Sequence, residues 1–107
     1  MDSILQGTTP ALTIGINPAD FSVSNIVELE FAVQQKNNIT LYNLADVTID
    51  PEANTVTRQF TEAETLAFVP NLYVSVQLRF WFPDGSIIGT KPISIYVDDL
   101  LSEEVTK

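Results

Sequence analysis

The strongest constraint on the fold is a strict alternation of side chains along one long segment. From Leu72 to Phe82 every even position is aliphatic or phenylalanine, whereas the odd positions include serine, glutamine and arginine. Successive side chains of a β-strand point to opposite faces, so this pattern predicts a strand with one buried face. The next four residues, Pro83-Asp84-Gly85-Ser86, are typical of a type I turn. They predict a hairpin loop followed by a returning strand from Ile87 to Val97.

The apolar residues of these two strands predict their register. The expected cross-strand pairs on the inner face are Phe82–Ile87, Phe80–Gly89, Val76–Ile93, Val74–Ile95 and Leu72–Val97. A slip of one residue would turn every apolar side chain to the wrong face. Pro92 has no amide hydrogen, so we expect the returning strand to lie at a sheet edge or to be covered there by the N-terminal segment.

Shorter segments with the same alternation predict the remaining strands. We expect strands at residues 10–16, 27–33, 39–42, 46–49 and 55–60. The residues predicted to point inward from the first two are Leu12, Ile14, Ile16, Val27, Leu29, Phe31 and Val33. Turns are predicted at Asn37-Asn38 and at 50–54, where Pro51 removes a ladder donor.

One segment, residues 61–68, has helical character. Thr61 and Glu64 have the spacing of a capping box, and Pro70 prevents much continuation. We therefore predict one or two helical turns that cross between two sheets, with Leu66 and Phe68 closing one end of the core.

These elements together predict one all-β domain over residues 1–107. Six to eight short strands, frequent turns and a single helical crossover near 61–68 are typical of an immunoglobulin-like antiparallel β-sandwich, with a small barrel as the alternative. A chain of 107 residues buries about two-thirds of the surface of its unfolded form, which is enough for a core. The alternation ends at Asp98, so we expect residues 98–107 to form a tail that frays at its end.

The composition excludes several classes of function. The chain has neither histidine nor cysteine, which removes disulfides, thiolate metal sites and a Ser-His-Asp triad. Five Lys and Arg residues stand against 14 Asp and Glu residues, a net charge of −9 that argues against nucleic acid and anionic membranes. No stretch resembles a membrane span, and the first six residues lack the features of a signal peptide, so we expect synthesis and retention in the cytoplasm or export within a larger particle.

Acidic residues offer only weak candidates for chemistry. Glu28 and Glu30 share a strand face, with Cα atoms roughly 6.6 Å apart, a spacing that glycoside hydrolysis could use. Asp46, Asp50 and Glu52 surround one turn, but their spacing does not match a calcium loop. We interpret all of these as solvated or turn residues, and we expect no catalytic residue, cofactor or metal.

The outer face of the 72–82 hairpin is the more informative feature. In the predicted register Tyr73 faces Tyr96 and Trp81 faces Ile88, all on the side away from the core. Large apolar side chains on a solvent face mark surfaces that bind partners. The alternatives are that these four residues lie at a covered end of the sandwich, or that the rings form a platform for a sugar.

Three motifs follow one another along the chain: the opening Gly7-Thr8-Thr9-Pro10-Ala11-Leu12-Thr13, the segment from Phe60 to Leu66, and the hairpin from Val76 to Phe80 with Pro83-Asp84-Gly85. Together they resemble small structural proteins of phages and prophages of Gram-positive bacteria, similar to the N-terminal domain of phage baseplate upper proteins. The resemblance extends from about Ser3 to Val97. It implies an immunoglobulin-like sandwich that serves in a virion, with the Gly7–Pro10 segment in the first strand and no catalytic residues.

We therefore expect a non-enzymatic virion structural or tail- and baseplate-associated domain made in the bacterial cytoplasm. Its expected partners are other phage particle proteins or further copies of itself, through Tyr73, Trp81, Ile88 and Tyr96, without cofactor, nucleic acid or membrane. The alternative, of a different class, is a carbohydrate-binding module for cell-wall glycans that uses the same aromatic residues.

Overall fold

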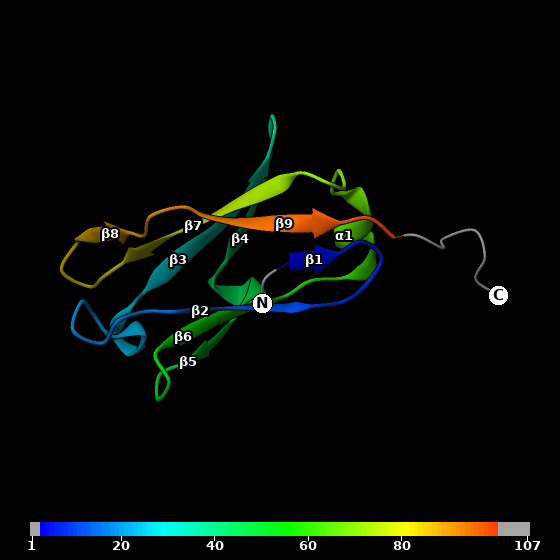
Figure 1. The fold of residues 1–107 in the computed structure, drawn as a ribbon. Helices are drawn as coiled ribbons and strands as arrows, with labels where there is room; N and C mark the ends of the chain where they lie inside the picture. Colours follow the sequence, from blue (N-terminus) through cyan, green and yellow to red (C-terminus); the bar gives the residue numbers. More distant parts are fainter. Residues whose placement is uncertain (1–2, 101–107) are drawn as a thin grey trace.

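The computed structural model describes residues 3–100, whose strands form two sheets packed face to face (Figure 1). The larger sheet has the order β1-β9-β7-β3-β4, and β8 also pairs with β7. Its strands are β1 (Ser3–Leu5), β3 (Glu28–Gln35), β4 (Asn38–Asn43), β7 (Tyr73–Trp81), β8 (Ile87–Gly89) and β9 (Ile93–Asp98). The smaller sheet has the order β2-β6-β5, with bounds Ala11–Gly15, Thr55–Gln59 and Thr48–Asp50.

Within the described part of the chain, three short helices lie in the connections between strands. The α-helix α1 (Glu62–Ala67) joins β6 to β7 and is the crossover between the sheets. Two 3-10 turns, η1 (Val23–Asn25) and η2 (Leu44–Asp46), precede β3 and β5. The predicted all-β sandwich with one helical crossover is confirmed. Its β2-β6-β5 and β9-β7-β3-β4 sheets have the immunoglobulin-like arrangement.

The core lies between the middle strands of the two sheets. Leu29, Phe31 and Val33 from β3 are buried, as predicted, as are the predicted inward residues of β7. Residues of the smaller sheet, among them Leu12 and Val56, cover them from the opposite side. The inward prediction for Val27 is wrong, because this residue precedes β3 and 55% of it is exposed.

The predicted register of the long hairpin is right in one half and wrong in the other. Val76 pairs with Ile93 and Val74 with Ile95, as expected. At the other end Phe80 pairs with Ile88 instead of Gly89, and Trp81 pairs with Ile87 instead of Ile88. The expected 87–97 strand is therefore divided into β8 and β9, with one additional residue between them.

The register changes at a β-bulge over residues 90–92. Here three residues of the returning strand oppose two of β7, which shifts the pairing by one residue. The Leu78 amide donates to Thr90 Oγ1 (3.1 Å), and the Thr90 amide donates to the Leu78 carbonyl (2.9 Å). A threonine hydroxyl thus replaces a backbone acceptor. Pro92 follows in the bulge, where its missing amide hydrogen removes no hydrogen bond between the strands.

The N-terminal segment covers part of this edge. β1 pairs in parallel with β9, with Ser3 opposite Tyr96 and Leu5 opposite Asp98, so covering by the N-terminal segment is confirmed for that stretch. The Gly7–Pro10 segment, which the resemblance placed in the first strand, instead forms a turn between β1 and β2. Gly7 has a φ of +76°, a conformation that a residue with a side chain rarely adopts.

The capping box of α1 is confirmed, but the expected role of Leu66 is wrong. Thr61 caps the helix and exchanges hydrogen bonds with Glu64, as the spacing predicted. Leu66 is 45% exposed, whereas Thr65 is buried and Phe68 packs against the core. The Thr65 hydroxyl accepts from the Gly7 amide (3.0 Å) and donates to the Thr8 carbonyl (2.8 Å), so it fixes the turn after β1 to the helix. The tail predicted over 98–107 starts one residue too early, because Asp98 is the last residue of β9, and residues 101–107 lie outside the described residues.

Candidate interaction surfaces

The outer face of the larger sheet brings two of the four predicted interface residues together. Tyr73 and Tyr96 pair across β7 and β9, with ring centroids 5.2 Å apart and planes at 70°. Tyr73 is 62% exposed, and the Tyr96 hydroxyl donates to Asn71 Oδ1 (3.1 Å). The two rings form an edge-to-face pair at one end of the sheet.

Trp81 lies on the same face but at the other end. It lies eight positions along β7 from Tyr73, roughly 27 Å in an extended strand. Its side chain is half-buried, and the Arg79 guanidinium lies 4.9 Å from its ring centroid. Trp81 therefore belongs to a surface separate from the tyrosine pair.

The placement of Ile88 on the outer face is wrong. Because the bulge shifts the register, Ile88 pairs with buried Phe80 and shares the inner face, while Ile87 takes the place beside Trp81. Ile88 lines a shallow pocket of about 470 Å³ with Phe21 and Phe82. The outward isoleucine is thus Ile87, which is 53% exposed.

Two further apolar residues on the outer face were missed in the sequence. Ile39 and Leu41 of β4 are 58% and 57% exposed, and they lie opposite Gln34 and Ala32 of β3. The strand from Asn38 to Asn43 alternates isoleucine and leucine with threonine and tyrosine, so its pattern did not distinguish its two faces. The pairing with Ala32, an outward residue of β3, is the signal that could have placed them.

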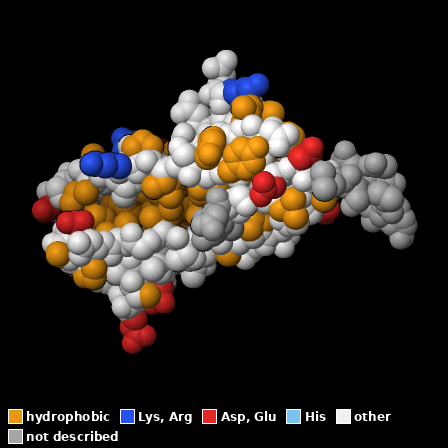
Figure 2. Space-filling model, viewed as in Figure 1, with side chains coloured by type: hydrophobic (Ala, Val, Ile, Leu, Met, Phe, Trp, Pro, Cys, Tyr) orange, Lys and Arg blue, Asp and Glu red, His pale blue; other side chains and the backbone are white. Residues whose placement is uncertain are grey.

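A third apolar surface lies along the seam between the sheets. Figure 2 shows hydrophobic side chains gathered in a band between β2 and the β8–β9 edge. A pocket of about 590 Å³ occupies one end of this seam, with Ile16, Phe21 and Ile88 in its lining. β1 pairs with β9 only from Tyr96 to Asp98, so it leaves this end open.

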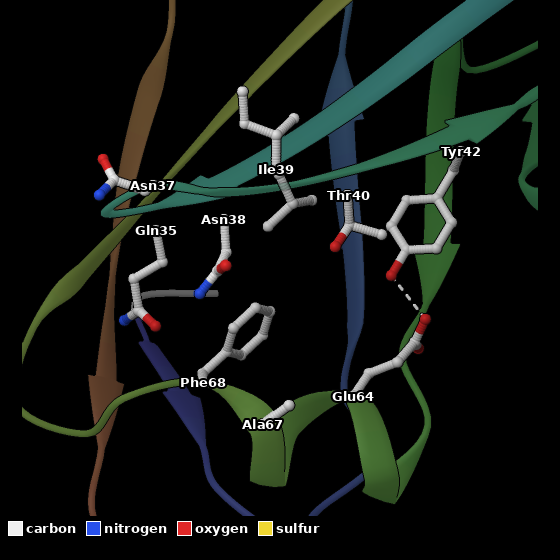
Figure 3. A pocket seen from close by; sticks show the side chains of 10 residues that line it. Gln35, Asn37, Asn38, Ile39, Thr40, Tyr42, Glu64, Ala67 and Phe68 are labelled. Atoms are coloured by element: carbon white, nitrogen blue, oxygen red, sulfur yellow. Dashed lines mark hydrogen bonds between the residues drawn. The ribbon is translucent and has the colours of Figure 1, made fainter.

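A partly polar pocket of about 550 Å³ separates β4 from α1 (Figure 3). The amides of Gln35 and Asn38 lie above Phe68, and Tyr42 and Glu64 point toward each other at the far side. Gln35 is fully engaged with the backbone, because it donates to the Val69 carbonyl (2.9 Å) and accepts from the Val69 amide (2.7 Å). The pocket is an opening where the smaller sheet does not cover the β3–β4 hairpin.

A cluster of Tyr42, Arg58 and Glu64 closes the wall of this pocket. The Tyr42 hydroxyl donates to Glu64 Oε2 (2.5 Å), Arg58 Nη2 forms an ion pair with the same oxygen (2.5 Å), and the guanidinium lies 3.9 Å from the Tyr42 ring centroid. Arg58 Nη1 also donates to the Asp46 carbonyl (2.9 Å). The cluster connects β4, β6, η2 and α1, which sequence reasoning could not bring together.

The environment of this cluster shifts two pKa values. Burial, and then the hydrogen bond to Glu64, raise the pKa of Tyr42 to about 12. Burial alone would raise the pKa of Glu64, but hydrogen bonds from Tyr42, the Thr61 backbone and Arg58 outweigh it and lower that pKa. The folded state therefore favours a neutral phenol beside an ionised carboxylate.

These shifts predict a loss of stability in alkali. The unfolded tyrosine ionises near its usual pKa of 10.0 and the folded one near 12, so the free energy of unfolding should fall as the pH rises through this interval. Urea unfolding of the wild type and of Tyr42→Phe at several alkaline pH values will measure it. We expect a smaller fall in the variant, and an identical pH dependence would contradict the assignment to Tyr42.

The acidic candidates are engaged in structural contacts. Glu30 forms an ion pair with Arg79 (3.0 Å), and Glu28 Oε1 accepts from the Leu44 amide (3.1 Å). Asp46 accepts from the Asn43 amide, and Asp50 accepts from two amides of its own turn. Within residues 3–100 no three acidic side chains gather as a metal site would require.

No protein-family model and no curated protein matches the sequence. Among the described residues, no helix has the length and apolar character needed to cross a membrane. The surfaces themselves are therefore the basis for assigning a function.

Proposed function

We propose that the chain is a non-enzymatic structural domain of a phage or prophage particle that assembles with other particle proteins through the outer face of its larger sheet. One observation carries this proposal. Among residues 3–100, five large hydrophobic residues are more than half exposed, and four of them lie on that face: Ile39, Leu41, Tyr73 and Ile87. The fifth, Val27, precedes β3.

The physical basis of assembly is burial of these side chains on a rigid support. Each aliphatic or aromatic side chain transferred fully from water contributes about 1.5–3 kcal/mol before the losses of association. The strands already hold the backbone fixed, so little backbone entropy is lost on binding beyond the rigid-body and side-chain freedom that any association costs. The phage context is supported by the resemblance of the 60–66 and 76–85 segments, which here form the helical crossover and the long hairpin.

Binding to particle proteins can be tested by co-expression with the proteins encoded on either side of its gene. We expect one of them to co-purify, and the double variant Tyr73→Ser/Ile87→Ser to weaken this binding at least tenfold, about 1.4 kcal/mol. Val27→Ser is the matched control, because it removes an equally exposed apolar residue that precedes β3 and belongs to none of the strands of this face. Equal loss in the control, or full binding by the double variant, would contradict the proposal.

The geometry gives less support to carbohydrate binding. A sugar platform needs coplanar rings, whereas Tyr73 and Tyr96 meet at 70° and Arg79 lies over Trp81. Titration with cell-wall glycans, followed by Trp81 fluorescence, distinguishes the two functions. Saturable binding of a glycan would favour the carbohydrate-binding module.

A further inference from the structure

β4 is the longest uncovered edge strand within residues 3–100. Protein sheets protect their edges with charges, prolines or very short strands. β8 has three residues and is followed by Lys91 and Pro92, and β5 has three residues and ends at Asp50 before Pro51. β2, at the other edge of the smaller sheet, has five residues, one fewer than β4. β4 has six residues, none of them charged and none a proline, and the β3–β4 hairpin projects from the body of the molecule (Figure 1).

The backbone groups of β4 that point to this open side can be identified. The Asn43 amide donates to Asp46 Oδ2 (3.0 Å), so it points away from β3. In an antiparallel pair the groups that face the neighbouring strand belong to every second residue. The amides and carbonyls of Ile39 and Leu41 therefore also point to the open side, where another strand could pair with them.

We propose that this edge pairs with β4 of a second copy of the chain, in antiparallel register about a twofold axis at Thr40. The proposal deepens the proposed function, on which it rests, by identifying one partner. In this register Ile39 of each copy lies opposite Leu41 of the other, and the two Thr40 residues face each other. The residues that pair are the ones whose backbone groups are free, and apolar and Thr–Thr cross-strand pairs stabilise sheets.

The charges at the two ends of the hairpin support a second copy as the occupant. Lys36 lies in the turn at the tip, and Glu28 and Asp46 lie at the base, where each accepts an amide hydrogen bond from residues 43–44. The proposed register places Lys36 of one copy opposite Leu44 of the other. Each basic tip thus meets an acidic base, twice per dimer, although the chain as a whole carries a charge of −9.

A charge exchange tests both the edge and the register. We expect sedimentation velocity to show that the wild type forms a concentration-dependent dimer. Ile39→Glu and Leu41→Lys should each weaken this dimer at least tenfold, because each places two charges of the same sign in the interface with no opposite charge beside them. The double variant I39E/L41K should restore the dimer, since the glutamate of one copy then faces the lysine of the other. Val27→Lys is the matched control and should leave the dimer intact.

Several results would overturn the inference. One is a wild type that stays monomeric at all concentrations, and another is a dimer that the single variants do not weaken. A third is a double variant that dimerises as weakly as the single variants while its circular dichroism shows a native fold. The variant Tyr73→Ser/Ile87→Ser separates this inference from the proposed function. Loss of particle-protein binding in that variant, with no dimer in the wild type, would refute the β4 pairing and leave the assembly function standing.

Discussion

Replacing Asn54 with alanine should lower the free energy of unfolding by about 4 kcal/mol, a large part of the stability of a domain of this size. Asn54 is buried in the turn between β5 and β6. Its Oδ1 accepts from the Val23 amide (2.8 Å), and its Nδ2 donates to the carbonyls of Ile16 and Phe21 (both 2.9 Å). Alanine removes all three bonds and leaves the Val23 amide without its buried acceptor.

The backbone conformation of Asn54 adds to this effect. Its φ of 57° lies in the left-handed region, which asparagine tolerates better than alanine. Asn54→Gly removes the same hydrogen bonds but relieves the strain, so it should be about 1 kcal/mol less destabilising than alanine. Urea unfolding followed by Trp81 fluorescence measures both. Equal losses in the two variants would show that the conformation contributes nothing, and a loss below about 1 kcal/mol in both would refute the role of the hydrogen bonds.

Arg58→Ala should destabilise the fold by about 3 kcal/mol, the second largest effect that we expect. The guanidinium is largely buried and contacts Glu64, the Asp46 carbonyl and the Tyr42 ring. Its removal leaves the Glu64 carboxylate with Tyr42 and the Thr61 amide alone. Arg58→Lys keeps the positive charge, but an ammonium group cannot contact both Glu64 and the Asp46 carbonyl as the planar guanidinium does. We therefore expect it to destabilise the fold, but by less than Arg58→Ala.

The same variant should change the response to acid. The lowered pKa of Glu64 contributes stability that is present above its usual value of 4.5 and is lost as the pH falls below it. Arg58→Ala removes one of the interactions that lower this pKa, so the difference in stability between wild type and variant should shrink in acid. Chemical unfolding at neutral and acidic pH measures this difference. A difference that does not change with pH would contradict the coupling between Arg58 and the pKa of Glu64.

The sequence predicted features that depend on neighbours along the chain. Period-two alternation located β3 and β7, and the spacing of Thr61 and Glu64 located the start of α1. The pairing of β7 with β9 followed because apolar residues stood on one face of each strand. Each of these patterns can be recognised within one strand or one helical turn of the sequence.

Features that depend on distant contacts were not predictable. At the bulge the Thr90 hydroxyl accepts the hydrogen bond that a backbone carbonyl would otherwise accept. The alternation of apolar and polar side chains does not indicate such a bond. Covering of β9 by the N-terminal segment was predicted, but β1 is too short to show a period, so its bounds and its parallel register with β9, more than 90 residues away in the chain, were not. Arg58 and Asn54 looked like ordinary polar residues of a strand and a turn, because their partners lie on other elements.

The bulge between β8 and β9 determines which of two adjacent isoleucines the molecule displays. If the returning segment kept the frame of Val76 and Ile93 without a bulge, Ile88 would lie outward beside Trp81 and Ile87 would face the interior. Deleting Lys91 would remove the bulge but keep the present pairs of β8, because two residues would then oppose two of β7. A chain shortened by one residue at this point should therefore still expose Ile87.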